Sequence, residues 1–267
     1  PVASAQVKSA ILLAGLYADG TTTVAEPTIS RDHTERMLAY FGAEVKRSGT
    51  TVSIKGGQKL IGKEIVVPGD ISSAAFFMVA ALITEDSELL IKNAGINPAR
   101  TGIIDILQAM SGDLKIVNQR EISGEPVGDI LAKSSKLKGI EIKGDIIPRA
   151  IDELPIVAVA AAFATGITKI RDAKELRVKE SDRIGTMATH LKGLGIRVTE
   201  YEDGMDIVGG KPKTIQDVFN SHGDHRVAMS MVVAGLAADR ELVVYDTDCI
   251  DTSFPGFRKL LESVKRA

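Results

Sequence analysis

The same order of elements recurs four times along the sequence, and this repetition limits the folds that the chain can adopt. In each copy an alanine-rich segment of helical length leads through a short turn into a β-branched run that is typical of a strand. The four helix and strand pairs cover residues 5–18 with 21–24, 72–82 with 87–91, 154–164 with 167–170, and 227–238 with 241–245. We therefore expect an α/β (α+β) protein built from copies of one unit.

A second helix is predicted after each of these strands, because apolar residues recur there at helical spacing. These segments are residues 34–41, 101–110, 182–194 and 254–264. Strand-like pieces follow in three copies, at residues 44–45 and 51–55, 114–117, and 196–200 with 205–208. With a further short strand before the next helix, the unit reads βαβαββ.

Three copies begin with the dipeptide Gly-Asp, at Gly69-Asp70, Gly144-Asp145 and Gly223-Asp224. Aspartate caps a helix N-terminus, and the positive end of the helix dipole attracts anions. Capping alone explains any single turn, whereas several such ends at one cleft would bind an anion. We expect residues 1–66 to be the last repeat of an N-terminal lobe whose remainder is absent, and residues 67–267 to be a C-terminal lobe of three repeats.

Composition and charge exclude several classes of function. The 33 Lys and Arg against 35 Asp and Glu give a net charge of −2 without a sustained basic run, so we expect no nucleic-acid partner. The longest apolar stretch, residues 156–164, is nine residues, about half of what a membrane span needs. The single Cys249 cannot form an internal disulfide, which fits a cytoplasmic protein and also many exported ones.

Charged residues stand at the predicted helix starts. Lys179 and Arg183 are four apart and either share a helical face or belong to a solvated helix start. Asp152 is either a cap or a site carboxylate, and Arg226 either an anion clamp or a surface cation. Because all of them occupy equivalent repeat positions, we expect them at one cleft, where they suit an anionic substrate on which a proton must move.

The sequence contains no strong metal or phosphate-loop motif. His222 and His225 are ligand-type residues, but no third and fourth ligands stand nearby, and we predict that they hold no zinc. His33 and His190 fall on predicted helices, where surface or core positions are expected.

Seven segments spread in order over the chain resemble the 5-enolpyruvylshikimate-3-phosphate synthase family. They are residues 4–10 (SAQVKSA), 30–36 (SRDHTER), 68–74 (PGDISSA), 152–155 (DELP), 177–183 (RVKESDR), 222–226 (HGDHR) and 252–256 (TSFPG). The resemblance implies two similar lobes, each of three βαβαββ units, with helix N-termini directed into the cleft between them. It also implies that the chain is the C-terminal portion of such an enzyme.

The resemblance implies that the chain belongs to an enzyme that catalyses one step of the shikimate pathway, in aromatic amino acid biosynthesis. Enolpyruvyl passes from phosphoenolpyruvate to the 5-hydroxyl of shikimate 3-phosphate through a tetrahedral intermediate, and phosphate leaves. No metal or organic cofactor is implied, and the full-length enzyme is expected to be a monomer. Because part of the family's site lies in an upstream region that is not in this sequence, the isolated chain is expected to be inactive.

The resemblance assigns substrate-binding roles to five residues besides the catalytic ones. Ser4 would hydrogen-bond the shikimate phosphate, Gln6 would touch both substrates, and Arg31 would lie beside the phosphate. Arg183 and Arg226 would clamp the carboxylate and phosphate of phosphoenolpyruvate, a role that suits the planar guanidinium.

Three residues would bind substrate and carry the chemistry. Asp152 would hold the ring hydroxyls and take the proton of the 5-hydroxyl, Lys179 would bridge the substrates and transfer protons, and Glu180 would protonate the methylene carbon. Two positions depart from part of the family. Ala5 replaces a second serine and Thr252 replaces a lysine, which removes one phosphate contact and one cation.

Two other functions remain open from the sequence. The sister enzyme that transfers enolpyruvyl to UDP-N-acetylglucosamine shares the architecture, but the Ser-Ala-Gln and Lys-Glu-Ser-Asp-Arg segments favour shikimate 3-phosphate. The chain could also be a folded module without catalytic activity.

Overall fold

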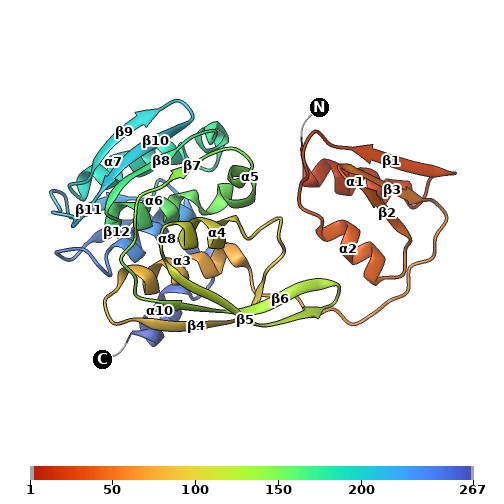
Figure 1. Cartoon of the computed structure of the whole chain (residues 1–267), viewed down its shortest axis with the longest axis horizontal. Coiled ribbons are helices and arrows are strands. Elements are labelled where there is room, and N and C mark those ends of the chain that lie inside the picture. The colour runs from red at the N-terminus through yellow and green to blue at the C-terminus, as the bar shows by residue number, and fades with distance from the viewer. Residues whose placement is uncertain (1–2, 266–267) are drawn as a thin grey trace. The chain divides into compact units, whose positions relative to one another are not determined.

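The structure is a computed structural model that describes residues 3–265 and consists of two compact units (Figure 1). The smaller unit contains Pro1–Gly69, Asn93–Arg100 and Asn118–Gly128, and the larger contains Asp70–Lys92, Thr101–Val117 and Asp129–Ala267. The lobe boundary expected near residue 66 stays a prediction. Residues 1, 2, 266 and 267, which the expected lobes include, lie outside the described residues.

The helices follow the expected order. They are α1 (Ala5–Gly15), α2 (His33–Tyr40), α3 (Ile71–Ile83), α4 (Gly102–Ala109), α5 (Ile146–Ala150), α6 (Leu154–Phe163), α7 (Arg183–Gly193), α8 (His225–Ala234), α9 (Ile250–Ser253) and α10 (Phe257–Val264), with short 3-10 helices η1 (Ile151–Glu153) and η2 (Lys174–Val178). Within residues 3–265, none of them combines the length and hydropathy that a membrane crossing requires.

The strands alternate with these helices. They are β1 (Thr21–Ala25), β2 (Val45–Ser48), β3 (Thr51–Lys55), β4 (Glu88–Gly95), β5 (Asp113–Ile122), β6 (Glu125–Lys133), β7 (Glu141–Ile142), β8 (Gly166–Ile170), β9 (Arg197–Tyr201), β10 (Gly204–Gly209), β11 (Val218–Asn220) and β12 (Val243–Tyr245).

The sheets repeat one topology, which confirms the predicted α/β repeat. The strand orders β1-β3-β2, β4-β6-β5 and β8-β10-β9 all place the last strand of a copy beside its first. A short strand also precedes the first helix and pairs in parallel across it, as β7 with β8 and β11 with β12. In the copy that begins before α3, the corresponding pairing is a single parallel bridge between Gly69 and Ala94.

Strand β6 is the main element that the sequence pattern did not predict. Its residues Val127, Gly128, Asp129 and Ile130 are buried in succession, so the strand lacks the alternation of apolar and polar side chains that marks a half-buried strand. Helix α8 ends at Ala234, four residues before the expected end. The last predicted helix, at residues 254–264, begins only at Phe257, because Gly256 adopts a positive φ of 79°. The separate short helix α9 precedes it and was not predicted.

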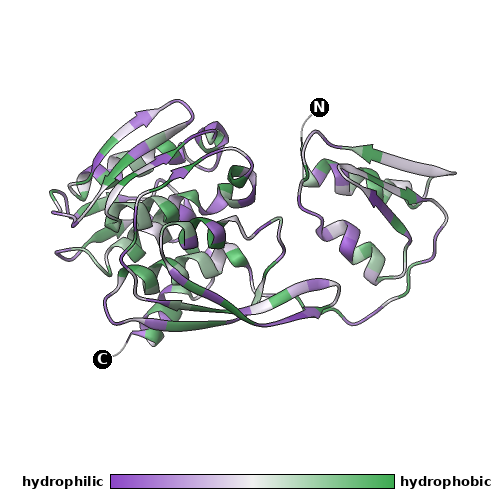
Figure 2. Ribbon diagram, viewed as in Figure 1, coloured by the Kyte–Doolittle hydropathy of each residue, from purple (hydrophilic) through white to green (hydrophobic). Residues whose placement is uncertain are grey.

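The core of the larger unit is formed by helices that are apolar on all sides. Eleven residues of α3 and nine of α6 are buried, as expected for helices that are enclosed by other elements. Helix α3 packs against α6 and α8, and α6 also packs against α7. These interior helices are coloured mostly hydrophobic in Figure 2, and Figure 1 shows them between the sheet of β7–β10 and the strands β4–β6. Their N-termini carry the polar residues of the candidate site.

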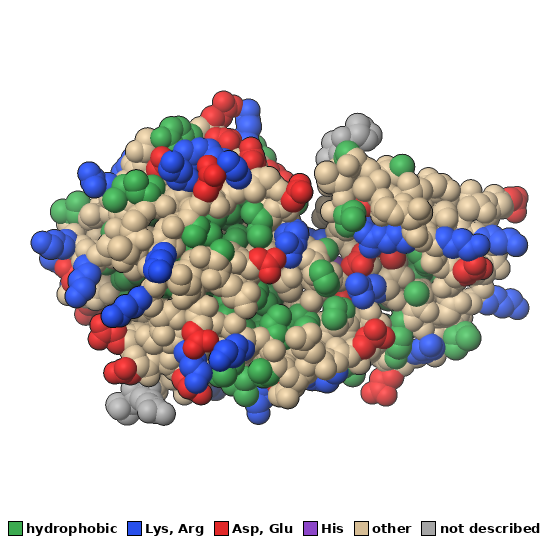
Figure 3. All heavy atoms as spheres, viewed as in Figure 1, with side chains coloured by type: hydrophobic (Ala, Val, Ile, Leu, Met, Phe, Trp, Pro, Cys, Tyr) green, Lys and Arg blue, Asp and Glu red, His purple; other side chains and the backbone are tan. Residues whose placement is uncertain are grey.

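The smaller unit has a separate core, in which α1 and α2 cover one three-stranded sheet. Leu12 of α1 and Leu16, the residue that ends this helix as its C-cap, pack with Leu38 of α2 and with Val52 and Ile54 of β3. On the face drawn in Figure 3, Lys and Arg side chains lie interspersed with Asp and Glu.

The repeated sheet makes a specific demand on Gly204, which begins β10. A Cβ atom at this position would lie 2.0 Å from the carbonyl oxygen of Ile170 in β8, whereas a Cβ at Gly210 would have no atom within 4 Å. We expect Gly204→Ala to lower the free energy of unfolding by about 2 kcal/mol, as overpacking does. Gly210→Ala is the matched control and should stay within about 0.5 kcal/mol. Urea denaturation of both variants measures this, and equal stabilities would contradict it.

Candidate functional site

A buried ion pair lies at the centre of the candidate site in the larger unit. The Nε atom of Arg183 is 2.8 Å from Oδ2 of Asp224, and Nη2 of Arg183 is 3.3 Å from Oδ1. The side chains of Arg183 and Asp224 are 1% and 0% exposed. Such burial of charge is tolerated only when the partners satisfy each other.

Asp224 owes its position to the start of α8, which it caps. Its carboxylate accepts hydrogen bonds from the backbone N–H of Arg226 at 2.9 Å and of Val227 at 3.3 Å, and from the Ser181 hydroxyl at 3.0 Å. Burial favours the neutral acid, but the hydrogen bond and positive charge of Arg183 outweigh it and lower the pKa of Asp224. This carboxylate is therefore ionised at neutral pH and neutralises the buried guanidinium.

Two further carboxylates approach Arg183. Its Nη2 atom lies 2.6 Å from Oε2 of Glu180, and its Nη1 atom lies 3.9 Å from Oδ1 of Asp152 in η1. The start of α7, the segment before it, η1 and the start of α8 thus converge on one guanidinium. Asp152 thus lies close to Glu180 and Arg183, although about 30 positions separate it from them in the sequence.

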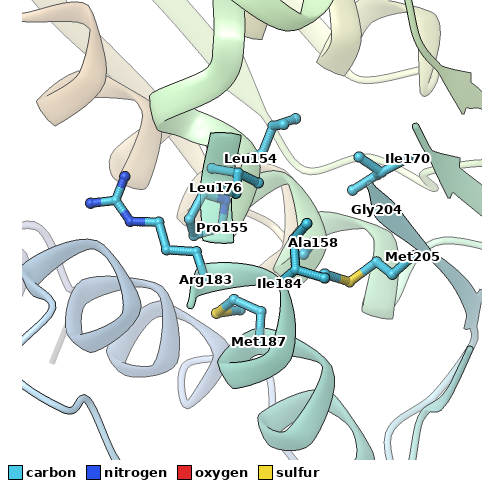
Figure 4. Close-up of a pocket in the computed structure, with 10 residues that line it drawn as sticks. All are labelled: Leu154, Pro155, Ala158, Ile170, Leu176, Arg183, Ile184, Met187, Gly204 and Met205. Atoms are coloured by element: carbon cyan, nitrogen blue, oxygen red, sulfur yellow. The ribbon is translucent and has the colours of Figure 1, made fainter. Parts of the chain in front are cut away.

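The side chain of Arg183 begins beside the apolar core, and its guanidinium group points away from that core. Figure 4 shows the side chain extending away from the apolar residues that line a small cavity, among them Leu154, Ile184 and Met187. The cavity has a volume of about 10 Å³, which is about the space of one water molecule. It is a packing gap too small for a substrate. The carboxylates of Asp152, Glu180 and Asp224 instead meet Arg183 at its guanidinium.

Helix α3 is tied to the same region through its first turn. Asp70 caps α3 by accepting from the N–H groups of Ser72 at 3.1 Å and Ser73 at 3.3 Å. The Ser72 hydroxyl donates to the buried carboxylate of Glu153, the residue before α6. The N-termini of α3, α6 and α8 are therefore linked in series, and their dipoles place partial positive charge in one region.

One of the three Gly-Asp turns differs from the expectation. Asp70 and Asp224 cap the long helices of their copies, but Asp145 makes no side-chain cap hydrogen bond. It precedes the short α5, and η1 then separates α5 from α6. This insertion brings Asp152 and Glu153, rather than Asp145, to the start of the apolar helix.

Lys179 lies in the segment between η2 and α7, four residues before Arg183. Its Nζ atom forms an ion pair with Glu175 of η2, and its side chain is about one quarter exposed. Glu180 is half-exposed. Both can change partners more easily than the buried Arg183.

Arg177 of η2 stands just before this segment and has a role that the sequence pattern did not reveal. Its Nε donates to the Glu202 carbonyl at 2.8 Å, and its Nη2 donates to the Tyr201 carbonyl at 2.6 Å. Its Nη1 donates at 2.7 Å to Asp182, which caps α7. Arg177 therefore fastens the segment to the turn between β9 and β10, and Arg183 fastens the other end. The sequence pointed to Arg177 only through the motif RVKESDR, because its two carbonyl partners lie about two dozen positions away.

Arg226 stands at the second residue of α8 and is half-buried. Within the part of the chain that the structure describes, its side chain has no ion pair and no hydrogen bond. A cation is unfavourable at a helix N-terminus, where the dipole is positive. The neighbouring His225 adds no second charge, because burial and the charge of Arg226 lower its pKa.

The histidines expected in surface or core positions are found there. His190 is buried, hydrogen-bonds the Asn220 carbonyl at 2.8 Å and packs edge-on against Phe219. His33 is largely exposed and lies 2.7 Å from Glu125. Among residues 3–265 no group of three or more His, Cys, Asp or Glu is arranged to hold a metal ion.

Three expected substrate contacts belong to the smaller unit. Ser4 caps α1, and its Oγ accepts the N–H of Val7 at 3.3 Å. Gln6 is exposed in the first turn of α1, and Arg31 lies in the loop between β1 and α2.

A sequence model of the family described as EPSP synthase (3-phosphoshikimate 1-carboxyvinyltransferase) matches residues 1–261. The chain belongs to this family. Proteins named 3-phosphoshikimate 1-carboxyvinyltransferase from Geobacter metallireducens and Geotalea daltonii are 61% and 63% identical to it over 263 and 264 residues. These matches cover 98% and 99% of the chain, and the chain spans about 61% of each relative.

Solved structures agree with this membership. The EPSP synthase of Acinetobacter baumannii matches with a TM-score of 0.93 and 51% identity, over 99% of this chain and 61% of that one. The enolpyruvyl transferase NikO of Streptomyces tendae matches with a TM-score of 0.71 and 23% identity, over 95% of this chain and 56% of that one, which shows a shared fold.

The buried pair of this family member gives a stability prediction. We expect Asp224→Asn to lower the free energy of unfolding by about 3 kcal/mol, because it leaves the Arg183 charge buried without its main partner. Glu180→Gln removes a half-exposed partner of the same guanidinium and should cost less than about 1 kcal/mol. Chemical denaturation of both variants tests the difference. If Asp224→Asn is no less stable than Glu180→Gln, the pair does not have this structural role.

Proposed function

We propose that the chain is the C-terminal portion of an enzyme that transfers enolpyruvyl from phosphoenolpyruvate to the 5-hydroxyl of shikimate 3-phosphate. The observation that carries this proposal is the family match over residues 1–261, joined to a cluster of cations and carboxylates at linked helix N-termini. Because the chain spans about 61% of its relatives, the complete activity requires the part that it lacks.

The proposed reaction has two steps, an addition that forms a tetrahedral intermediate and an elimination that releases phosphate. In the first step Asp152 accepts the proton of the 5-hydroxyl group of shikimate 3-phosphate, and the oxygen of this hydroxyl attacks the central carbon of phosphoenolpyruvate. Lys179 or Glu180 gives a proton to the methylene carbon. The resulting tetrahedral intermediate then loses a proton from that methyl carbon, and the bond to the phosphate oxygen breaks. Phosphate leaves, and the enolpyruvyl ether remains. General acid and base groups of this type lower such barriers by moving protons within the site.

Binding of phosphoenolpyruvate is assigned to Arg226 and Arg183. The half-buried Arg226 has no anionic partner among the described residues, so a substrate anion would relieve the unfavourable charge at the start of α8. Arg183 already meets Asp224 and Glu180, and it would offer Nη1, the nitrogen nearest to Asp152. The buried Arg183 would then take part in substrate binding as well as in the packing of the helices.

The shikimate 3-phosphate contacts are assigned to Ser4, Gln6 and Arg31. The Ser4 hydroxyl accepts a hydrogen bond as the cap of α1, so its own hydrogen is available to a phosphate oxygen. We also propose that the complete enzyme is a cytoplasmic monomer that needs no metal or organic cofactor. The UDP-N-acetylglucosamine transferase and the non-catalytic module are the outcomes that would replace this function.

Turnover tests this proposal directly. We expect residues 1–267 alone to release no phosphate from the two substrates, because part of the site is absent. The same chain joined to the unmatched part of the Geobacter metallireducens relative should release phosphate only when both substrates are present. Use of UDP-N-acetylglucosamine in place of shikimate 3-phosphate would favour the sister activity, and inactivity of a folded joined enzyme would favour the module.

The role of Arg226 gives a second kinetic prediction in the joined enzyme. Arg226→Ala should raise KM for phosphoenolpyruvate about tenfold, the equivalent of about 1.4 kcal/mol of lost binding, and leave KM for shikimate 3-phosphate within about twofold. Arg240→Ala removes an exposed arginine and serves as the control. Steady-state kinetics with each substrate varied measures both effects, and equal rises in the two KM values would refute the assignment.

A further inference from the structure

A buried lysine in the smaller unit joins three separate segments. Lys8 of α1 is 1% exposed, and its Nζ atom lies 3.0 Å from Glu26 Oε2 and 2.8 Å from Glu35 Oε1. The same atom is 3.5 Å from the carbonyl oxygen of Ser30. A lysine is almost never buried without such partners. Its ammonium therefore connects α1 with the end of β1, with α2 and with the loop between them.

Ser30 closes the network from the side of the loop. Its hydroxyl donates to Glu26 Oε1, and its N–H donates to Glu26 Oε2 at 3.4 Å. Burial raises the pKa of Glu26, but the hydrogen bonds from Ser30 and Lys8 and the charge of Lys8 outweigh it, so the net pKa is lowered. The carboxylate is therefore charged at neutral pH and holds the loop from two atoms.

The loop has no regular structure of its own. Residues 27–32 form neither helix nor strand, and residues 27–29 are exposed. Two residues that flank Arg31 anchor the loop. Ser30 is held by its bonds to Glu26. Asp32 is held by ion pairs with Arg36 and Arg47 and by a hydrogen bond from Asn97. On the other side, the backbone N–H of Lys8 donates to the Ser4 carbonyl at 3.0 Å, which places Ser4 one turn before Lys8 on the same face of α1.

Stability alone is a weak explanation for three buried charges. Replacing a buried ionic group by well-packed apolar side chains is often neutral or stabilising, whereas an ionic network can specify one geometry. An apolar side chain at position 8 could cover the core formed by Leu12 and Leu38 without fixing the loop. The bonds to Ser30 are what an apolar residue cannot replace.

We propose that Lys8, Glu26 and Ser30 are positioning residues, which hold Arg31 at the start of α1 in the geometry that binds the phosphate of shikimate 3-phosphate. This inference rests on the proposed function, in which Ser4 and Arg31 contact that phosphate. Lys8 and Glu26 are buried and act through the loop rather than on the substrate. A fixed arginine binds an anion more tightly than a mobile one, because less conformational entropy is lost on binding.

Ser30→Ala tests the proposal without leaving a buried charge unpaired, since Lys8 and Glu26 keep each other. In the 267-residue chain, hydrogen exchange of the amides of residues 28–32 should become about tenfold faster, with other regions unchanged. In the joined enzyme described above, KM for shikimate 3-phosphate should rise about tenfold, while kcat and KM for phosphoenolpyruvate stay within about twofold. Ser30→Thr keeps the hydroxyl and should restore both values, and Ser48→Ala in β2 is the exposed control.

The outcomes separate the two proposals. Unchanged exchange in the loop, or faster exchange with an unchanged KM for shikimate 3-phosphate, would overturn the positioning role. A general rise in exchange over the smaller unit would show a structural role only and would also overturn it. If the unsubstituted joined enzyme has no turnover, the proposed function and the substrate assignment of the network both fail, and exchange at residues 28–32 then decides only whether Ser30 holds the loop.

Discussion

The ion pair between Arg183 and Asp224 is the interaction on which the arrangement of the larger unit's polar residues depends. Asp224 caps α8 and binds the residue that begins α7, so one carboxylate fixes the relation between two helices. The linkage continues through Asp152 toward α6 and through Glu153 and Ser72 toward α3. Apolar packing alone orients helices loosely about their axes, whereas these directional bonds bring their first turns to common points.

The smaller unit uses the same physical device in a different place. Lys8 is enclosed by two carboxylates, as Arg183 is enclosed by three, and both cations lie beside residues that the family resemblance assigns to substrate. In both units the burial of charge is unfavourable, and apolar side chains could pack at these positions with similar stability. In each unit the ionic network also lies close in sequence to a half-buried arginine, since Ser30 precedes Arg31 and Asp224 stands two residues before Arg226.

Much of this fold could be predicted from the sequence, because the repeated unit has strong periodicity. The apolar segments that became α3 and α6 were predicted to within a residue at each end, and the βαβαββ order follows from turns such as Gly69-Asp70. Strand β6 could not be predicted, since its successive burial follows from pairing between β4 and β5. Local sequence carries no signal of that pairing.

The residues of the candidate site could be proposed from the sequence, whereas the bonds among them could not. Motifs and equivalent repeat positions pointed to Asp152, Lys179, Arg183 and Arg226. They did not indicate that Asp224 would be the partner of Arg183, or that an inserted turn would replace the Asp145 cap. Pairings over 40 or more positions, such as that of Arg183 with Asp224, depend on helix packing that no local pattern contains.

The anchoring of Arg177 has a consequence for how this protein can diverge. Two of its bonds go to backbone carbonyls, that of Tyr201 at the end of β9 and that of Glu202 in the turn before β10. Carbonyl groups are present whatever side chains occupy these positions, so substitutions in the turn leave those two acceptors in place. An inserted or deleted residue would instead move both acceptors and, through Arg177, displace the start of α7. As the protein diverges, the residues of this turn should therefore vary in identity while the number of residues in the turn stays the same.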